Sequence, residues 1–111
     1  MLNQSILVGR IVREPEVRET ENGNKVTNIT LAVQRPYKNV EGEYETDFIP
    51  CILWKGIAET TSEYCRKGDL IGIRGRIQTR VNEYPDQIKR NVMEIVAERV
   101  TFLSNKKQEE D

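Results

Sequence analysis

Three aromatic side chains in the middle of the chain have the spacing of a surface on which planar bases can stack. Phe48 and Trp54 are six residues apart on one predicted strand, so they share a face and lie about 20 Å apart at ~3.3 Å per residue. Tyr37 follows the preceding predicted strand, and Tyr84 lies at the tip of a later connection, where it could clamp a bound strand. Exposed rings of this kind stack on bases of any sequence and contribute roughly 1–3 kcal/mol per base.

Basic side chains are interleaved with these rings. The region from Ile71 to Asn82 contains three arginines on the polar face of a predicted strand and no acidic residue. The candidate phosphate-binding cations are Arg10, Arg35, Lys38, Lys55, Arg74, Arg76 and Arg80. Because the charges are segregated along a chain of nearly neutral balance, a basic groove is possible, and its binding would weaken with salt.

Two simpler interpretations compete with a binding surface. Phe48 and Trp54 could belong to the core, and the arginines could be only the solvated side of their strand. The opposite face of the strand with Phe48 and Trp54 already carries Ile49, Cys51 and Leu53, which favours exposure of the two rings.

The composition argues against catalysis. The chain has 111 residues, no histidine, and 17 basic against 18 acidic side chains, for a formal net charge of -1. Histidine is the commonest general base and a frequent zinc ligand, and Cys51 and Cys65 are too far apart for a redox or four-ligand zinc motif. The four carboxylates within residues 41–47 could hold a cation, but they are more typical of solvated charges that discourage edge pairing. We expect no enzyme activity, no metal site and no cofactor.

The hydrophobic pattern predicts five strands and one short helix. The strands are expected at 6–12, 25–34, 44–55, 70–81 and about 89–103, the helix at 57–68, a hairpin turn at Asn22-Gly23 and a loop at 35–43. This order is that of an OB-fold, an all-β, five-stranded Greek-key barrel with one short helix between strands 3 and 4. Element order alone leaves other barrel and α+β folds open.

The length predicts one domain at 1–104, followed by a short charged C-terminal tail at 105–111 that we expect to be disordered. No run approaches the ~18 apolar residues that a membrane span needs. The first five residues lack the basic-then-apolar layout of a signal peptide. We therefore expect a cytoplasmic, nucleoid-associated protein with no membrane partner.

A series of short motifs runs through most of the chain in a characteristic order. They are Leu2-Asn3-Gln4 to Val8-Gly9-Arg10, Glu14-Pro15-Glu16-Val17-Arg18, Asn28 to Val33, Asp47-Phe48 through Leu53-Trp54, Ala58-Glu59, Tyr64 to Gly68, and Gly75 to Arg80. In these motifs the chain resembles the bacterial single-stranded DNA-binding proteins (SSB) over roughly residues 1–103.

The resemblance implies an OB-fold subunit of a homotetramer that binds single-stranded DNA without sequence preference. Such a protein protects the unpaired strand in DNA replication, repair and recombination. By position, the resemblance implies base stacking on Tyr37, Phe48 and Trp54, with phosphate contacts from Arg35, Lys55, Arg76 and Arg80. The family often carries another aromatic residue just after the Thr-Arg pair, where this chain has Val81, with Tyr84 three residues later.

The C-terminal end differs from the family pattern. Full-length members continue through a flexible segment to an acidic tip ending in Pro-Phe, which recruits replication and repair proteins, whereas this sequence stops at Glu109-Glu110-Asp111. Recruitment by that route is therefore not expected. The sequence is either a core cut from a longer protein or a naturally short paralogue, like those that coat DNA during competence or plasmid transfer.

Two other functions fit an OB-fold of this size. A primosomal replication-restart module, which mainly contacts proteins, would be a dimer with weak DNA binding. An RNA-binding OB domain of the translation machinery would prefer ribonucleotides, because the 2′-hydroxyl distinguishes RNA from DNA.

Overall fold

The computed structural model describes residues 1–83 and 89–104. Its elements in chain order are β1 (Ser5–Ile11), β2 (Arg18–Glu19), β3 (Lys25–Lys38), β4 (Tyr44–Trp54), α1 (Lys55–Tyr64), β5 (Leu70–Glu83) and β6 (Lys89–Ser104). The predicted strands are therefore all present, with boundaries shifted by a few residues. β2, which pairs with the start of β3 beyond the turn at Gly23, is an additional short strand. The predicted tail at 105–111 lies outside the described residues.

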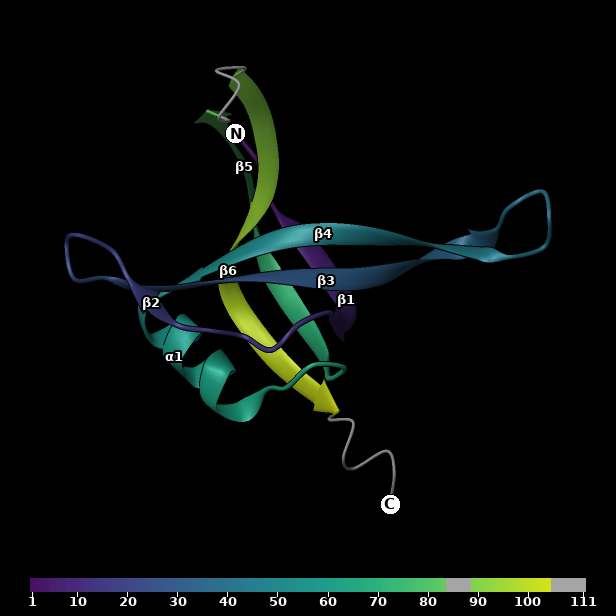
Figure 1. Ribbon diagram of the computed structural model, residues 1–111. Coiled ribbons are helices and arrows are strands. Elements are labelled where there is room, and N and C mark those ends of the chain that lie inside the picture. The colour runs from purple at the N-terminus through teal and green to yellow at the C-terminus, as the bar shows by residue number, and fades with distance from the viewer. Residues whose placement is uncertain (84–88, 105–111) are drawn as a thin grey trace.

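Five of the strands close into a barrel. The sheet order is β1-β5-β6-β4-β3-β2, and an additional pairing of β1 with β3 joins the two sides (Figure 1). All pairings are antiparallel except that of β4 with β6, which is parallel. This arrangement, with one short helix between the third and fourth barrel strands, confirms the predicted OB-fold.

The core fills the barrel with side chains from alternate strand positions. Ile29 and Leu31 of β3, Leu53 of β4, and Ile71 and Ile73 of β5 are buried together. Because side chains of a strand alternate between its faces, the residues between them point outward. The outer face of β3 and β4 is thereby left available for a binding surface.

Helix α1 covers one end of the barrel, and its Ala58 belongs to the core (Figure 1). The helix is shorter than predicted, because Cys65 has extended backbone angles and residues 66–69 form a turn. Gly68 has the expected left-handed conformation, with a φ of 93°, but it lies in this turn rather than directly after the helix. Tyr64, predicted on the inner side of the helix, is 65% exposed.

Two glycines allow backbones to approach closely within the barrel. A Cβ on Gly9 would lie 2.6 Å from the carbonyl oxygen of Ala32, and a Cβ on Gly75 would overlap the carbonyl of Val96. Gly75 also lies at a register shift between β5 and β6. Beyond this point Ile77 and Val81, on the same strand face as the buried Ile73, are exposed.

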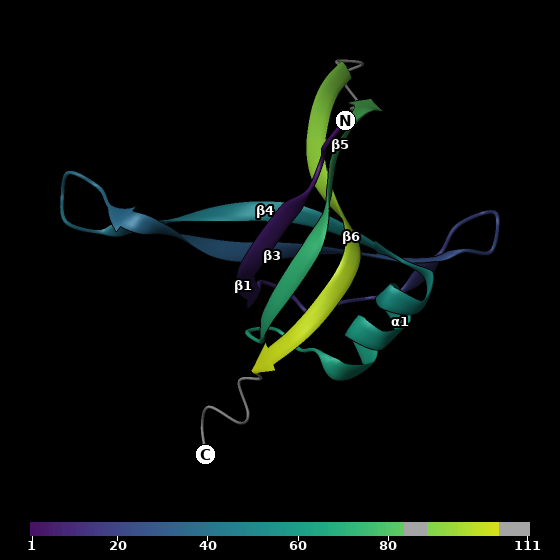
Figure 2. The same ribbon diagram turned by 180° about the vertical axis from the view of Figure 1, so that it is seen from behind.

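The β3–β4 and β5–β6 hairpins extend beyond the barrel as arms (Figures 1 and 2). In the β3–β4 arm, β3 continues to Lys38, so most of the loop predicted at 35–43 is replaced by strand and a turn that begins at Asn39. The Asn39 Oδ1 accepts hydrogen bonds from the backbone N–H groups of Glu41 and Glu43, and Gly42 has a φ of 81°. The β5–β6 arm rises in another direction, beside the N-terminus. There the Asn3 side chain bonds both the N–H and the carbonyl of Ile77.

Candidate nucleic-acid interface

The outer face of β4 carries both of the predicted stacking rings. Phe48 is 64% exposed and lies opposite Ala32 of β3, a residue too small to cover it. Trp54 lies opposite Val26 and packs against a small apolar cluster of Val26, Ile52 and Val96. Trp54 is therefore both part of a structural cluster and partly accessible, whereas Phe48 has most of its ring in solvent.

The cluster beneath Trp54 connects the aromatic face to the basic strand. Ile52 of β4 pairs with Val96 of β6, and Val96 pairs with Arg76 of β5. Arg76 is exposed, and its Nη1 lies 3.9 Å from Glu98 Oε2. Pairs of exposed charges at this separation contribute little to stability, so Arg76 can exchange its partner for a phosphate.

A polar cleft with a volume of about 650 Å³ lies beside the same face, between the segment 13–18 and the barrel wall. Its lining includes three arginines (Arg13, Arg18 and Arg80) and three glutamates (Glu14, Glu16 and Glu94), together with Pro50 of β4, so its charges are balanced. Arg13 and Arg18 were not among the sequence candidates. Arg18 falls within one of the characteristic motifs, but nothing local shows that its segment lies against β3 and β4.

Arg80 is held at the wall of this cleft by a buried carboxylate. Glu94 is only 3% exposed, and its Oε1 accepts hydrogen bonds from Gln78 Nε2 at 3.0 Å and Arg80 Nε at 3.2 Å. A carboxylate removed from water requires such partners. This hydrogen bond therefore fixes the position of the Arg80 side chain, whereas an arginine without such a bond would be mobile on the surface.

Arg35 lies in the β3–β4 arm and is engaged by two carboxylates of β4. Its Nε and Nη2 donate to Asp47, and its Nη1 donates to Glu45. The hydrogen bond from Arg35 lowers the pKa of Asp47, and the same bond together with the charges of Asp47 and Glu45 raises the pKa of Arg35. Tyr37, two residues further on, is 63% exposed.

The remaining sequence candidates are placed differently. Lys55 follows Trp54 directly, is exposed, and has a φ of 55°, an uncommon left-handed conformation for a side chain with a Cβ, at the corner between β4 and α1. Arg74 lies on the other side of Gly75 from Arg76, where its cross-strand neighbours are Ile6 and Arg99. These neighbours belong to β1 and β6 rather than to β3 and β4, the strands of the aromatic face. Tyr84 lies outside the described residues.

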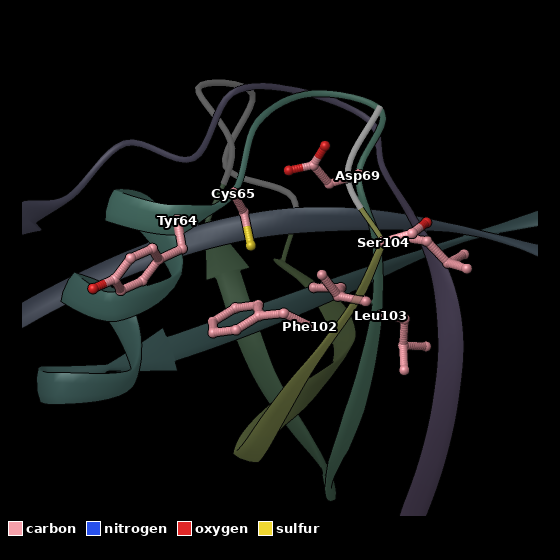
Figure 3. Close-up of a pocket in the computed structure, with 8 residues that line it drawn as sticks. Tyr64, Cys65, Asp69, Phe102, Leu103 and Ser104 are labelled. Atoms are coloured by element: carbon pink, nitrogen blue, oxygen red, sulfur yellow. The ribbon is translucent and has the colours of Figure 1, made fainter. Parts of the chain in front are cut away.

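A second hollow lies where α1 and β6 end (Figure 3). It has a volume of about 280 Å³ and is lined by Tyr64, Cys65, Asp69 and Phe102, among others, with the ring centroids of Tyr64 and Phe102 6.1 Å apart. Of the predicted binding residues that the structure describes, none lines this hollow. The exposed ring of Tyr64 in this hollow can therefore serve as a control for Phe48, because it lies away from the predicted binding residues.

The thiols and carboxylates do not form a chemical site in the described part of the chain. Cys51 and Cys65 are free and buried, and burial raises the pKa of Cys51 to about 12 and of Cys65 to about 11. Within residues 1–83 and 89–104, no group of three or more His, Cys, Asp or Glu side chains could hold a metal ion. No helix in these ranges is long and apolar enough to cross a membrane.

Comparison with known proteins matches these features to a family. Residues 2–103 match the family described as "Single-strand binding protein family". The chain belongs to this family. The match begins before β1 and ends one residue before the end of β6, so it includes all the predicted binding residues.

Several curated relatives are similar over most of this chain. "Single-stranded DNA-binding protein B" of Bacillus subtilis (strain 168) is 45% identical over 109 residues, which are 98% of this chain and 96% of that protein. "Single-stranded DNA-binding protein" of Halalkalibacterium halodurans is 50% identical over 103 residues, 93% of this chain but 61% of that protein. "Single-stranded DNA-binding protein 3" of Listeria innocua serovar 6a is 48% identical over 106 residues, 96% of this chain and 66% of that protein. The chain thus spans nearly all of one relative and about two thirds or less of the others.

Proposed function

We propose that this protein binds single-stranded DNA without sequence preference, by stacking bases on aromatic rings of the β3–β4 face while basic side chains contact the phosphates. The observation that carries the proposal is the outer face of β4, where exposed Phe48 and the supported ring of Trp54 lie beside a cleft whose lining includes three arginines and three glutamates. Membership in the single-strand binding protein family supports it. Binding that depends on stacking and on phosphate charge does not read the sequence of the strand.

Each group has a role in this proposal. Phe48 and Trp54 stack on bases, and Tyr37 adds a third ring on the arm. Arg76, Arg80 and Lys55 contact phosphates, and Arg13 and Arg18, in the cleft that they share with Glu14 and Glu16, are further candidates for phosphate contact. Arg74, on the neighbouring stretch of β5, and Tyr84 remain predicted contacts. The function is binding rather than catalysis, and it requires no cofactor.

We also propose that the protein is a homotetramer. The surface of β1 supports this, because Ile6 and Val8 point outward and Ile6 is 74% exposed. Among the described residues, β1 pairs with β3 only at Arg10 and Ile11, so the edge from Ser5 to Gly9 is open on that side. An exposed apolar strand with a free edge is typical of a surface that another chain covers.

A tetramer of this kind would coat unpaired DNA and keep it from re-pairing during replication, repair and recombination, as part of the nucleoid in the cytoplasm. Coating requires only that each subunit binds any sequence. The stacking face and the exposed basic side chains beside it meet this requirement without a base-specific pocket.

The test is a titration of tryptophan fluorescence with poly(dT) at low and high salt, together with the solution mass. Trp54 is the only tryptophan, so its quenching reports on a single position. We expect strong quenching by a tetramer and an affinity that falls steeply with salt, because bound cations are displaced from the phosphates. Competition with poly(U) and duplex DNA should be weak. If neither quenching nor the anisotropy of labelled poly(dT) shows binding at low salt, the proposed function is wrong.

A further inference from the structure

The β3–β4 arm contains a bulge at the base of the segment that carries Tyr37. Gln34 pairs with Thr46 and Lys38 pairs with Tyr44, so three residues of β3, 35–37, lie opposite one residue of β4, Glu45. Extra residues in one strand interrupt the ladder and redirect the side chains that follow. The orientation of Tyr37 therefore depends on how this bulge is held.

Arg35 holds the bulge through all three nitrogens of its guanidinium. Nε donates to both carboxylate oxygens of Asp47, at 3.2 and 3.1 Å, and Nη2 donates to Asp47 Oδ1 at 2.9 Å. Nη1 donates to Glu45 Oε2 across the bulge. An arginine fork that meets a carboxylate with parallel N–H groups is among the stronger and more directional ion pairs in proteins.

The same contacts make Arg35 a poor phosphate ligand. Its one positive charge faces two carboxylates, so the local charge of the three side chains is negative. A phosphate would have to displace a carboxylate from the guanidinium and then lie next to the displaced group. Arg76, by contrast, has one acidic neighbour within residues 1–83 and 89–104, Glu98 at 3.9 Å.

We propose that Arg35 is a positioning residue: clasped by Asp47 and Glu45 across the bulge, it holds Tyr37 in the orientation for base stacking and does not contact phosphate itself. This inference rests on the proposed DNA binding and assigns a role within it. The next cross-strand residue pair, Lys38 and Tyr44, is also held together, since Lys38 Nζ lies 5.6 Å from the ring centroid of Tyr44. The bulge is therefore bounded by side-chain contacts on both sides.

The decisive variant is Asp47→Asn, because the two roles predict opposite changes. This substitution removes a negative charge and weakens the hydrogen bonds between Arg35 and residue 47, while it keeps the shape of the side chain. If Arg35 positions Tyr37, binding of an oligo(dT) should weaken by about 3- to 10-fold, a fraction of the about 5- to 150-fold that stacking on one ring supplies. If Arg35 contacts phosphate, its release and the loss of a carboxylate should both strengthen binding.

Glu43→Gln is the matched control. Glu43 is an exposed carboxylate on the same arm, and its side chain takes no part in the bonds of Arg35. Glu43→Gln removes the same negative charge but leaves the hydrogen bonds of Arg35 intact, so the affinity for oligo(dT) should stay equal or increase slightly. Affinity of Asp47→Asn that matches or exceeds that of Glu43→Gln would overturn the positioning role.

A second measurement uses Arg35→Gln, read as the slope of log affinity against log salt. Each phosphate contact to a single strand contributes about 0.7 to this slope. A positioning role leaves the slope unchanged. The losses of affinity from Arg35→Gln and Tyr37→Ala should also not add in the double variant, since both substitutions remove the same stacking interaction of Tyr37. A slope lower by about 0.7, or fully additive losses, would contradict the inference. Wild-type protein that does not bind oligo(dT) would instead overturn the proposed function.

Discussion

Replacing Phe48 by alanine tests whether the outer face of β4 binds DNA. The side chain is 64% exposed, so folding covers only about a third of it. An aromatic side chain buries roughly 150–250 Å² when fully covered. About 70 Å² are then lost, and at about 25 cal/mol per Å² the free energy of unfolding should fall by at most about 2 kcal/mol.

The effect on binding should be separable from this loss. A base that stacks on the ring contributes roughly 1–3 kcal/mol, so Phe48→Ala should weaken oligo(dT) binding by about 5- to 150-fold. The salt dependence should not change, because no phosphate contact is removed. Trp54 remains in this variant and reports both binding and denaturant-induced unfolding by its fluorescence.

Tyr64→Ala is the matched control. Tyr64 is 65% exposed, nearly the same as Phe48, but it lies in the hollow at the end of α1, beside Phe102 (Figure 3). It should lose a similar amount of stability and no affinity. Normal binding by folded Phe48→Ala would show that the ring is not a stacking platform. Equal losses of affinity in both variants would show that the binding face is not specific to β3 and β4.

Three further predictions concern the barrel itself. Gly75→Ala should lower the free energy of unfolding by about 1–3 kcal/mol in chemical denaturation, because the added Cβ overlaps the Val96 carbonyl. Thr27→Val should raise it by about 1 kcal/mol, since the Thr27 hydroxyl is buried without a hydrogen-bond partner among the described residues; a loss of stability would contradict this. Cys51 and Cys65 should not react with a disulfide reagent at about pH 8 until the protein unfolds, because their raised pKa values leave almost no thiolate. Since these thiols hold their protons more tightly when folded, stability should be unaffected below pH 9 and fall as the pH rises from 9.0 toward 12.

The strands and the face of each ring follow from local pattern. Side chains alternate along a strand, so the positions of Phe48 and Trp54 relative to Leu53 are set once that segment is extended, whatever lies around it. The turns at Gly23 and Gly42 also follow from local sequence, because both glycines have a φ of 81°, which other residues rarely adopt. The end of α1 was misjudged, because the periodic pattern continues past Tyr64 while the backbone leaves the helix to reach β5.

The roles of the charged residues were decided by contacts between distant segments. Arg35 has the sequence signature of a phosphate-binding cation, but the pairing of β3 with β4 places it against carboxylates 10 and 12 residues away in the chain. Arg80 is fixed by Glu94, 14 residues away, only because the β5–β6 register brings the two together. Arg13 and Arg18 line the cleft beside the outer face of β4 because their segment lies against the barrel wall.

Periodicity and composition were enough to predict the succession of strands and helix along the chain, the two-sided character of β4 and the presence of rings and cations in one region. The carboxylates that surround each cation became visible only in the folded chain. Two of them engage Arg35 and a buried one holds Arg80, and these arrangements are set by strand register, bulges and barrel closure rather than by position along the chain.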